Sequence, residues 1–217
     1  MSRALRAVVF DWDGTLVDSA AVSYRCYARL FESFGLPFDH EAFARTYSPE
    51  WTRTYEALGL PRARWDEADR LWLDLYGRER SALFPAARET LQALAADGFE
   101  IGLVTSGDRV RVTGELRDLE IEPLFRSIVC GGDVRPKKPH PAPLLRALDS
   151  LCTPPKEAVY VGDSPEDVQM ARAAGVLSVG IPGGFPNREA LLASRPDWVV
   201  FDLETLRATL GPGPAAR

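Results

Sequence analysis

Short apolar runs recur along the chain, and each run stops at a polar or turn-forming residue. They cover residues 7–10, 100–104, 127–130, 158–161, 177–181 and 198–201. Continuous apolar runs of this length are typical of strands that are buried on both faces of a parallel sheet. We therefore expect these runs to form the strands of the core.

Stretches with helical periodicity lie between the apolar runs, at residues 87–96, 109–119, 142–151, 165–174, 189–193 and 203–210. This alternation of strands and helices predicts an α/β fold with a doubly wound, mostly parallel, Rossmann-like sheet. Open sheets of this kind bind ligands at the carboxyl ends of their strands. The residues that follow the apolar runs are therefore the first candidates for a functional site.

One segment, from residue 18 to residue 83, interrupts the alternation. It has helical stretches separated by Gly-Leu-Pro and Ser-Pro sequences, and it contains no convincing strand. Because it follows the first strand directly, we expect residues 18–83 to form a helical cap on an α/β catalytic core made of residues 1–17 and 84–210. The Gly- and Pro-rich tail, residues 211–217, has little to bury, and we expect it to be flexible.

Composition narrows the functional class. The chain has 217 residues, 46% of them hydrophobic and 26% charged, which is ordinary for a soluble globular protein. The sequence shows neither an apolar stretch of membrane-spanning length nor a secretory signal, so we expect a cytoplasmic protein with no membrane partner. The net charge of −5, without a basic stripe, argues against nucleic-acid binding. A monomer and a homodimer both remain open.

The cysteines and histidines offer little material for a zinc site or a disulfide. Cys26, Cys130 and Cys152 are scattered and show no Cys-x-x-Cys spacing, so we expect buried free thiols. His40 and His140 are the only histidines in the sequence. Chemistry built on carboxylates is therefore more plausible than chemistry built on histidine.

The sharpest motif follows the first apolar run and reads Asp11-Trp-Asp13-Gly14-Thr. Residues i and i+2 of a strand project to the same side, so both carboxylates can face one cleft. Gly14 permits a backbone turn that other residues resist. The alternative is a polar turn in which both aspartates cap backbone amides.

A second acidic motif follows the fourth run, in the sequence Gly-Asp163-Ser164-Pro165-Glu-Asp167. Ser164 and Pro165 suit the N-cap and first position of a helix. Asp163 and Asp167 are four residues apart and can share a face. Asp167 also fits a capping box with Ser164, so a structural role and a functional role for it stay open.

Two weaker signals complete the set. Thr105 and Ser106 place hydroxyls at the end of the second run, where hydroxyl side chains that cap a helix are also common. Lys137-Lys138-Pro is a rigid basic turn, and a solvated surface loop is the alternative for it. An aspartate pair, a Thr/Ser, a Lys-Pro and a Gly-Asp-x-x-x-Asp, in this order, resemble the haloacid dehalogenase superfamily. Residues 10–19 (FDWDGTLVDS) are most similar to its phosphoglycolate-phosphatase-like branch, which carries a helical cap.

This resemblance implies a Mg²⁺-dependent phosphatase that hydrolyses a small phosphorylated metabolite through an aspartyl-phosphate. Asp11 would be the nucleophile and Asp13 the general acid/base. The phosphoryl oxygens would be held by Thr105, Ser106 and Lys138. The metal would be held by Asp11, Asp163, Asp167 and the backbone carbonyl of Asp13. Converging carboxylates agree with this, because they repel one another unless a cation lies between them.

Alternatives from other classes are less consistent with the sequence. True dehalogenases of the superfamily lack the second aspartate of the first motif, which is present here as Asp13. Sugar-phosphate mutases of the same fold often use a cap histidine just after that motif, and residues 19–24 contain none. A non-enzymatic phosphoacceptor signalling domain would not need the helical insert or Asp163.

Two further expectations concern specificity and the lysine pair. The loop at residues 46–53 interrupts the helical pattern, and Arg53 in it is a possible specificity residue that binds a second anion on the substrate. A solvated surface charge is the alternative for Arg53. Of the two adjacent lysines, we expect Lys138 to face the site and Lys137 to point to solvent.

Overall fold

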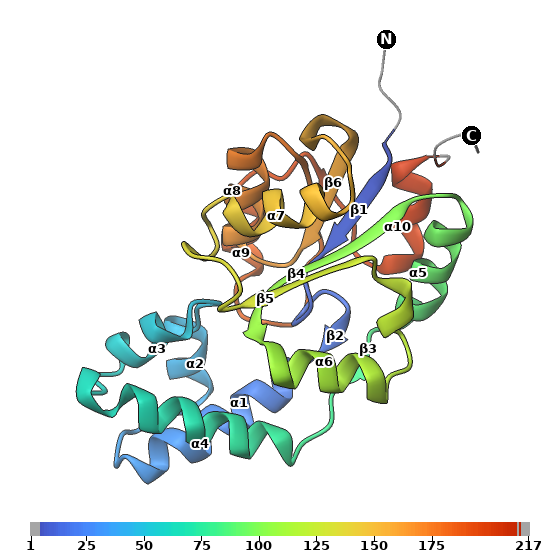
Figure 1. The fold of residues 1–217 in the computed structure, drawn as a ribbon. Coiled ribbons are helices and arrows are strands. Elements are labelled where there is room, and N and C mark those ends of the chain that lie inside the picture. Colours follow the sequence, from blue (N-terminus) through green and yellow to red (C-terminus); the bar gives the residue numbers. More distant parts are fainter. Residues whose placement is uncertain (1–4, 212, 214–217) are drawn as a thin grey trace.

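A computed structural model describes residues 5–211 and 213 of the chain. Its centre is a parallel sheet with the strand order β5-β4-β1-β6-β7-β8 (Figure 1). The strands are β1 (Ala7–Phe10), β4 (Glu100–Asp108), β5 (Ser127–Gly131), β6 (Ala158–Gly162), β7 (Leu177–Gly180) and β8 (Trp198–Val199). The predicted doubly wound α/β fold is confirmed.

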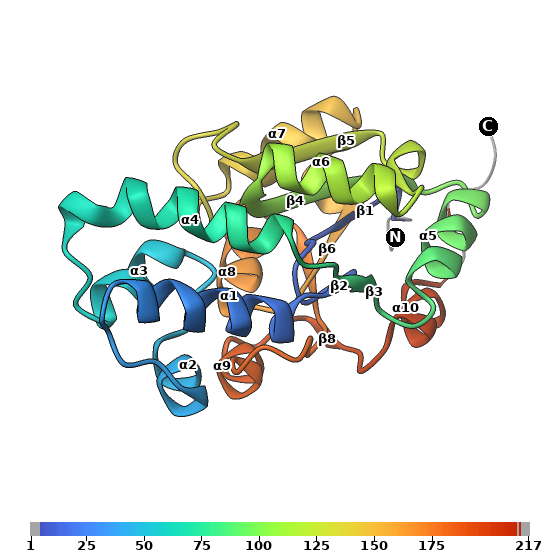
Figure 2. The same cartoon turned by 90° about the horizontal axis from the view of Figure 1, so that it is seen from below.

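Helices cover both faces of this sheet. On one face lie α5 (Ala87–Ala96), α6 (Arg109–Asp118) and α10 (Leu203–Leu210), and on the other lie α7 (Ala142–Ser150) and α8 (Pro165–Ala174), with α9 (Arg188–Ala193) beside α8 (Figures 1 and 2). Strand β1 contributes to both cores, because Val8 and Phe10 join one apolar cluster and Ala7 and Val9 join the other. This explains why its sequence is apolar throughout rather than alternating.

The segment after β1 is mainly helical and lies beyond the carboxyl ends of the strands (Figures 1 and 2). It contains α1 (Ala20–Ser33), α2 (His40–Thr46), α3 (Trp51–Ala57) and α4 (Trp65–Gly77). These helices enclose an apolar cluster of their own, which includes Leu30, Phe31 and Tyr55. The helical group therefore has a core that is separate from the two cores of the sheet.

The expectation of no strand in residues 18–83 was wrong at both ends of the segment. β2 (Val17–Asp18) and β3 (Ala82–Leu83) form a short antiparallel pair, with Val17 opposite Leu83. Strands of two residues are too short to produce a visible alternation of polar and apolar side chains. Their pairing means that the chain enters and leaves the helical group through two adjacent connections.

Most of the other predicted boundaries agree with the structure to within one or two residues, except that β4 runs on to Asp108. Short 3₁₀ helices lie at Arg62–Arg64, Glu122–Leu124 and Pro155–Glu157. Cys26 and Cys130 are buried as expected, but Cys152 is exposed because it lies in the turn after α7. In the predicted tail, residues 212 and 214–217 lie outside the described residues. Within the described part of the chain, the helices are too short or too polar to cross a bilayer.

Candidate active site

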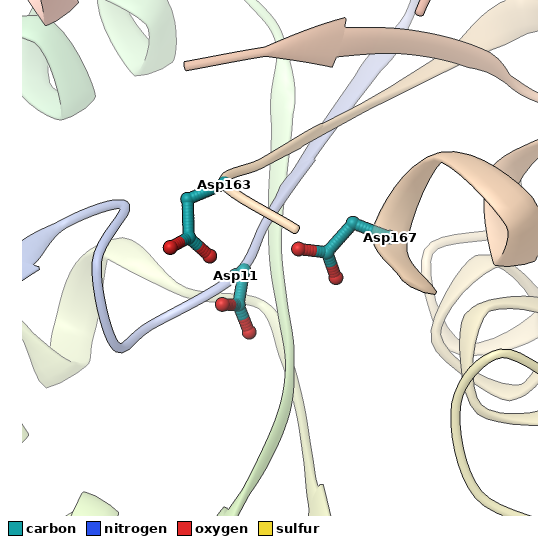
Figure 3. Close-up of side chains that lie close together, drawn as sticks. All are labelled: Asp11, Asp163 and Asp167. Atoms are coloured by element: carbon teal, nitrogen blue, oxygen red, sulfur yellow. The ribbon is translucent and has the colours of Figure 1, made fainter. Parts of the chain in front are cut away.

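Neighbouring strands bring acidic residues together at the carboxyl edge of the sheet. Phe10, the last residue of β1, is paired with Val161 of β6. Asp11 and Asp163 follow these strands directly, so the register places both at the same edge. Figure 3 shows the carboxylates of Asp11, Asp163 and Asp167 facing one another.

These three carboxylates form a compact, buried cluster. One oxygen atom from each lies within 4.8 Å of the other two, and all three residues are buried. Burial raises the pKa of Asp11 to about 7. Burial also raises the pKa of Asp163 well above its usual range, and the charges of Asp11 and Asp167 add to that effect. A divalent cation with a preference for oxygen ligands would favour the ionised forms, so the cluster fits a Mg²⁺ site.

Lys138 supplies the protein's own positive charge to this cluster. Its Nζ donates hydrogen bonds to Asp11 Oδ1 at 2.7 Å, Asp167 Oδ1 at 2.8 Å and Tyr160 Oη at 2.6 Å. The lysine is buried, and the charges of Asp11 and Asp167 raise its pKa although burial acts in the opposite direction. The ammonium therefore stays charged, but one ammonium cannot balance three carboxylates.

Asp167 forms the capping box that its spacing predicted and also lies in the acidic cluster. Its Oδ2 accepts hydrogen bonds from the N–H and the hydroxyl of Ser164, and Ser164 Oγ accepts from the Asp167 N–H, which completes the capping box of α8. Its Oδ1 meanwhile binds Lys138. The capping box holds the Asp167 carboxylate at the N-terminus of α8, and this position lies within the acidic cluster.

Two glycines allow the backbone to approach the carboxylates. Gly14 has a φ of +79°, and a Cβ on it would lie 2.4 Å from Asp163 Oδ2. A Cβ on Gly162 would lie 2.4 Å from Asp167 Oδ2. Side chains at these positions would displace the carboxylates, which explains why both motifs require glycine.

Asp13 lies beside the cluster and is held by Arg111 of α6. The guanidinium donates to Asp13 Oδ2 from Nη2 at 2.5 Å and to Oδ1 from Nη1 at 3.2 Å. Nη1 also donates to Glu115, whose carboxylate accepts from the Trp12 indole at 2.6 Å. The guanidinium carbon lies 4.7 Å from the ring centre of Tyr76 in α4. Asp13 is therefore positioned by a network that extends from the sheet to the helical group.

Thr105 and Ser106 lie in β4, next to β1, and both line the cavity described below. Thr105 is buried, and its Oγ1 accepts a hydrogen bond from the Gly107 N–H at 3.0 Å. The hydroxyl proton of Thr105 is therefore available to an acceptor at the strand end.

A cavity of about 330 Å³ lies between the sheet edge and the helical group. Its sheet side carries the residues of both acidic motifs and of the Thr/Ser and Lys-Pro motifs, namely Asp11, Asp13, Thr105, Ser106, Lys138 and Asp163. Asp167 lies behind this lining, in contact with Lys138. Carboxylates, an ammonium, a hydroxyl and a candidate cation site around one cavity are the groups that can bind a phosphoryl dianion and transfer it.

The structure places Lys137 differently from the prediction, and it places Arg53 at the surface, as in the second of the two alternatives. Lys137 was expected to point to solvent, but it is half-buried and its Nζ lies 4.1 Å from the ring centre of Trp51. The reason is that α3 presents this indole to the lysine loop, which gives the ammonium an aromatic face to pack against. Arg53 lies outside the cavity lining, with 58% of its side chain exposed and its Nε 2.8 Å from Glu50 Oε2.

The sequence analysis did not identify Arg111 or Tyr160 as residues of the site. Arg111 and Glu115 have the i,i+4 spacing of an ion pair on a helix, but nothing in that spacing indicates Asp13, which is 98 positions away. Tyr160 belongs to the apolar run of β6, and its hydroxyl donates to Val104 O at 2.8 Å while accepting from Lys138. An aromatic residue within a buried strand gives no signal for such a contact.

Comparisons with a family model and with the sequences of known proteins agree on one family. The model of the haloacid dehalogenase-like hydrolases matches residues 8–181. Phosphoglycolate phosphatase from Yersinia pestis is 35% identical over 224 residues, which cover 96% of this chain and 94% of that protein. Phosphoglycolate phosphatase from Escherichia coli (strain K12) is 34% identical over 234 residues, with coverage of 95% and 93%.

Solved structures agree with these sequence relatives. The crystal structure of a predicted phosphoglycolate phosphatase from Haemophilus somnus 129PT matches with a TM-score of 0.85 and 27% identity. The match covers 95% of this chain and 98% of that one. The similarity therefore includes both the sheet and the helical group.

Proposed function

The chain belongs to the haloacid dehalogenase-like hydrolases and is a phosphatase, and we propose that it hydrolyses a small phosphorylated metabolite with Mg²⁺ through a phosphoaspartate on Asp11. The observation that carries this proposal is the position of Asp11. Its carboxylate lies at the floor of the cavity, beside the Lys138 ammonium and the other two members of the acidic cluster.

Asp11 acts as the nucleophile. One of its oxygens attacks the phosphorus, and the bond between phosphorus and the leaving oxygen breaks. Lys138 holds Asp11 Oδ1 at 2.7 Å and carries the charge that a phosphoryl group requires. Thr105 and Ser106 donate to the phosphoryl oxygens from the end of β4.

Asp13 acts as the general acid and then as the general base. It gives a proton to the leaving oxygen as the alcohol departs, and later takes a proton from the water that attacks the phosphoaspartate. Inorganic phosphate is released and the Asp11 carboxylate is regenerated. Arg111 is a positioning residue in this scheme, because it holds both oxygens of Asp13.

The acidic cluster fits Mg²⁺, and Asp11, Asp163 and Asp167 would hold it together with the backbone carbonyl of Asp13. Burial, with repulsion among the carboxylates, raises the pKa of Asp11 and Asp163, and a cation would favour their ionised forms. When bound, Mg²⁺ supplies Lewis-acid stabilisation of the charge on the phosphoryl group.

Residues 18–83 act as a cap that covers the cavity and contacts the leaving group, and residues 84–210 complete the core begun by residues 1–17. A cap of this kind excludes water during transfer. Relatives named phosphoglycolate phosphatases favour a small phosphorylated substrate. A mutase would need an acid/base from the cap near the start of α1. The cavity residue there is Ser23, which favours hydrolysis.

A panel of phosphorylated metabolites, assayed for phosphate release with Mg²⁺ and with excess chelator, tests the proposal. We expect release from at least one small phosphomonoester that requires the metal and disappears in Asp11→Asn. Full activity in chelator would contradict the metal dependence. Isomerisation of a sugar phosphate without phosphate release would favour the mutase instead.

A further inference from the structure

The cap side of the cavity has an unusual chemical character. It is lined by the aromatic side chains of Tyr27, Tyr47, Trp51, Tyr55 and Trp72. Asp69 of α4 is the one charged residue that the cap contributes to this lining within the described part of the chain. The surface that would face a leaving group is therefore aromatic and acidic.

The basic residues of the cavity all come from the core, and they are engaged or peripheral. Lys138 is bound to Asp11 and Asp167, and Arg111 is bound to Asp13 and Glu115. Lys137 packs on the Trp51 indole, and its charge acts on Asp69, whose pKa it lowers. Arg135 is exposed to solvent.

The cap contributes no cation to the lining within the described residues, so a leaving group that carried a carboxylate would meet Asp69 and would have to share Lys137 with it. The Asp69 carboxylate and a carboxylate on the leaving group repel each other, and burial strengthens this repulsion because it weakens solvent screening. Asp69 is partly buried, and burial raises its pKa, although hydrogen bonds from Tyr55 and Trp51 and the charge of Lys137 act in the opposite direction.

The same surface suits an uncharged ring. Aromatic side chains bind flat, apolar groups through stacked or edge-on contacts. The Asp69 carboxylate accepts a hydrogen bond from a hydroxyl or amine. A cavity of about 330 Å³ also exceeds what a two-carbon leaving group fills.

We propose that the preferred substrates are phosphomonoesters of uncharged, ring-bearing alcohols with a hydroxyl or amine that donates to Asp69, and that short carboxylic-acid leaving groups are disfavoured. This rests on the proposed phosphatase function, and it concerns only the choice of leaving group. The preferred substrate of this chain would then differ from the phosphoglycolate that the names of its relatives give.

Three esters test the specificity: 3-(hydroxymethyl)benzyl phosphate, benzyl phosphate and 2-phosphoglycolate. For the wild type we expect kcat/KM to fall in that order. Asp69→Asn should lower kcat/KM for the hydroxymethyl ester by roughly tenfold or more, as expected for loss of a hydrogen bond to a charged group. The loss on benzyl phosphate should be smaller, and kcat/KM for 2-phosphoglycolate should rise by roughly threefold or more because a repulsion is removed.

Asp74→Asn is the matched control, because Asp74 lies on the same helix but is exposed and pairs with Arg78. It should leave the order of the three esters unchanged. A measurement without variants supports the same point: 1,3-benzenedimethanol should inhibit the wild type competitively, and glycolate at equal concentration should not.

The outcomes separate the two proposals. Preference for 2-phosphoglycolate, or a loss on that ester in Asp69→Asn, would overturn the leaving-group inference and leave the phosphatase function intact. If none of the three esters nor p-nitrophenyl phosphate is hydrolysed with Mg²⁺, the proposed function fails together with the inference.

Discussion

Arg111 donates hydrogen bonds to both carboxylate oxygens of Asp13, at 2.5 Å to Oδ2 and 3.2 Å to Oδ1. The guanidinium is almost fully buried, with 8% of its side chain exposed, and its other face lies against Tyr76. Asp13 therefore has a fixed position before substrate arrives. Arg111 therefore links the proposed acid/base to α4 of the helical group, so a movement of α4 would also displace Asp13.

Arg111→Ala should lower kcat/KM by roughly 10- to 100-fold, the range expected for loss of a hydrogen bond to a charged group. The loss should be larger for an alkyl phosphate than for an activated aryl phosphate, whose leaving oxygen needs no proton from Asp13. Arg111→Lys should restore part of the activity, because it keeps the charge but loses the two-pronged geometry. Steady-state kinetics on both esters measures these effects.

Arg109→Ala serves as the control for Arg111, because Arg109 is on the same helix and forms an exposed ion pair with Asp133. Exposed pairs contribute only about 0–1 kcal/mol, so this variant should resemble the wild type. Equal losses on alkyl and aryl esters in Arg111→Ala would show that the arginine acts on the fold rather than through Asp13.

The stability of the metal-free protein should fall as the pH rises from about 4 to about 7. In this range the unfolded chain has released the protons of Asp11 and Asp163, whereas the folded chain retains them because burial raises both pKa values. The folded state then binds more protons than the unfolded state, so the free energy of unfolding decreases with pH. Mg²⁺ should remove most of this decrease, because it stabilises the ionised carboxylates.

Denaturant melts in chelator and in Mg²⁺, at about pH 5 and about pH 7.5, measure this dependence. Asp163→Asn should flatten the pH dependence in chelator and reduce the gain from Mg²⁺. If the wild type and the variant show the same slope and the same gain, the acidic cluster is not the origin of either.

The two adjacent lysines should differ strongly in catalysis. Lys138→Ala removes the ammonium bound to Asp11 and should lower kcat by roughly 10²–10³-fold, as for loss of one preorganised electrostatic contact. Lys137→Ala removes the packing on Trp51 but no contact with Asp11, and a loss of a few-fold is expected because such a cation–π contact is worth about 1 kcal/mol. Equal or reversed losses in kcat/KM would show that the roles are misassigned.

Much of this arrangement was predictable because it is local in sequence. The apolar run of β1 ends where the first acidic motif begins, and the capping box of Ser164 and Asp167 forms as its spacing indicates. Parallel strands then bring Asp11 and Asp163 to one edge without any further information.

What the sequence did not predict depends on contacts between distant segments. The hydrogen bonds from Arg111 to Asp13 connect α6 with the loop after β1. Lys137 contacts the face of Trp51 only because α3 packs next to the lysine loop. Tyr160 binds Lys138 from within an apolar strand. Each contact depends on tertiary packing, and the local pattern around each residue is also satisfied by a solvated or purely structural role.

Trapping of the phosphoenzyme tests the central claim most directly. Asp13→Asn should still allow Asp11 to accept a phosphoryl group from p-nitrophenyl phosphate, because that leaving group needs no acid, but it should slow hydrolysis of the intermediate. After an acid quench with Mg²⁺ present, mass spectrometry should find one phosphoryl group on the peptide that contains Asp11. The modification should be absent from the Asp11→Asn, Asp13→Asn double variant. A phosphoryl group on any other residue, or its persistence in the double variant, would contradict the assignment of Asp11 as the nucleophile.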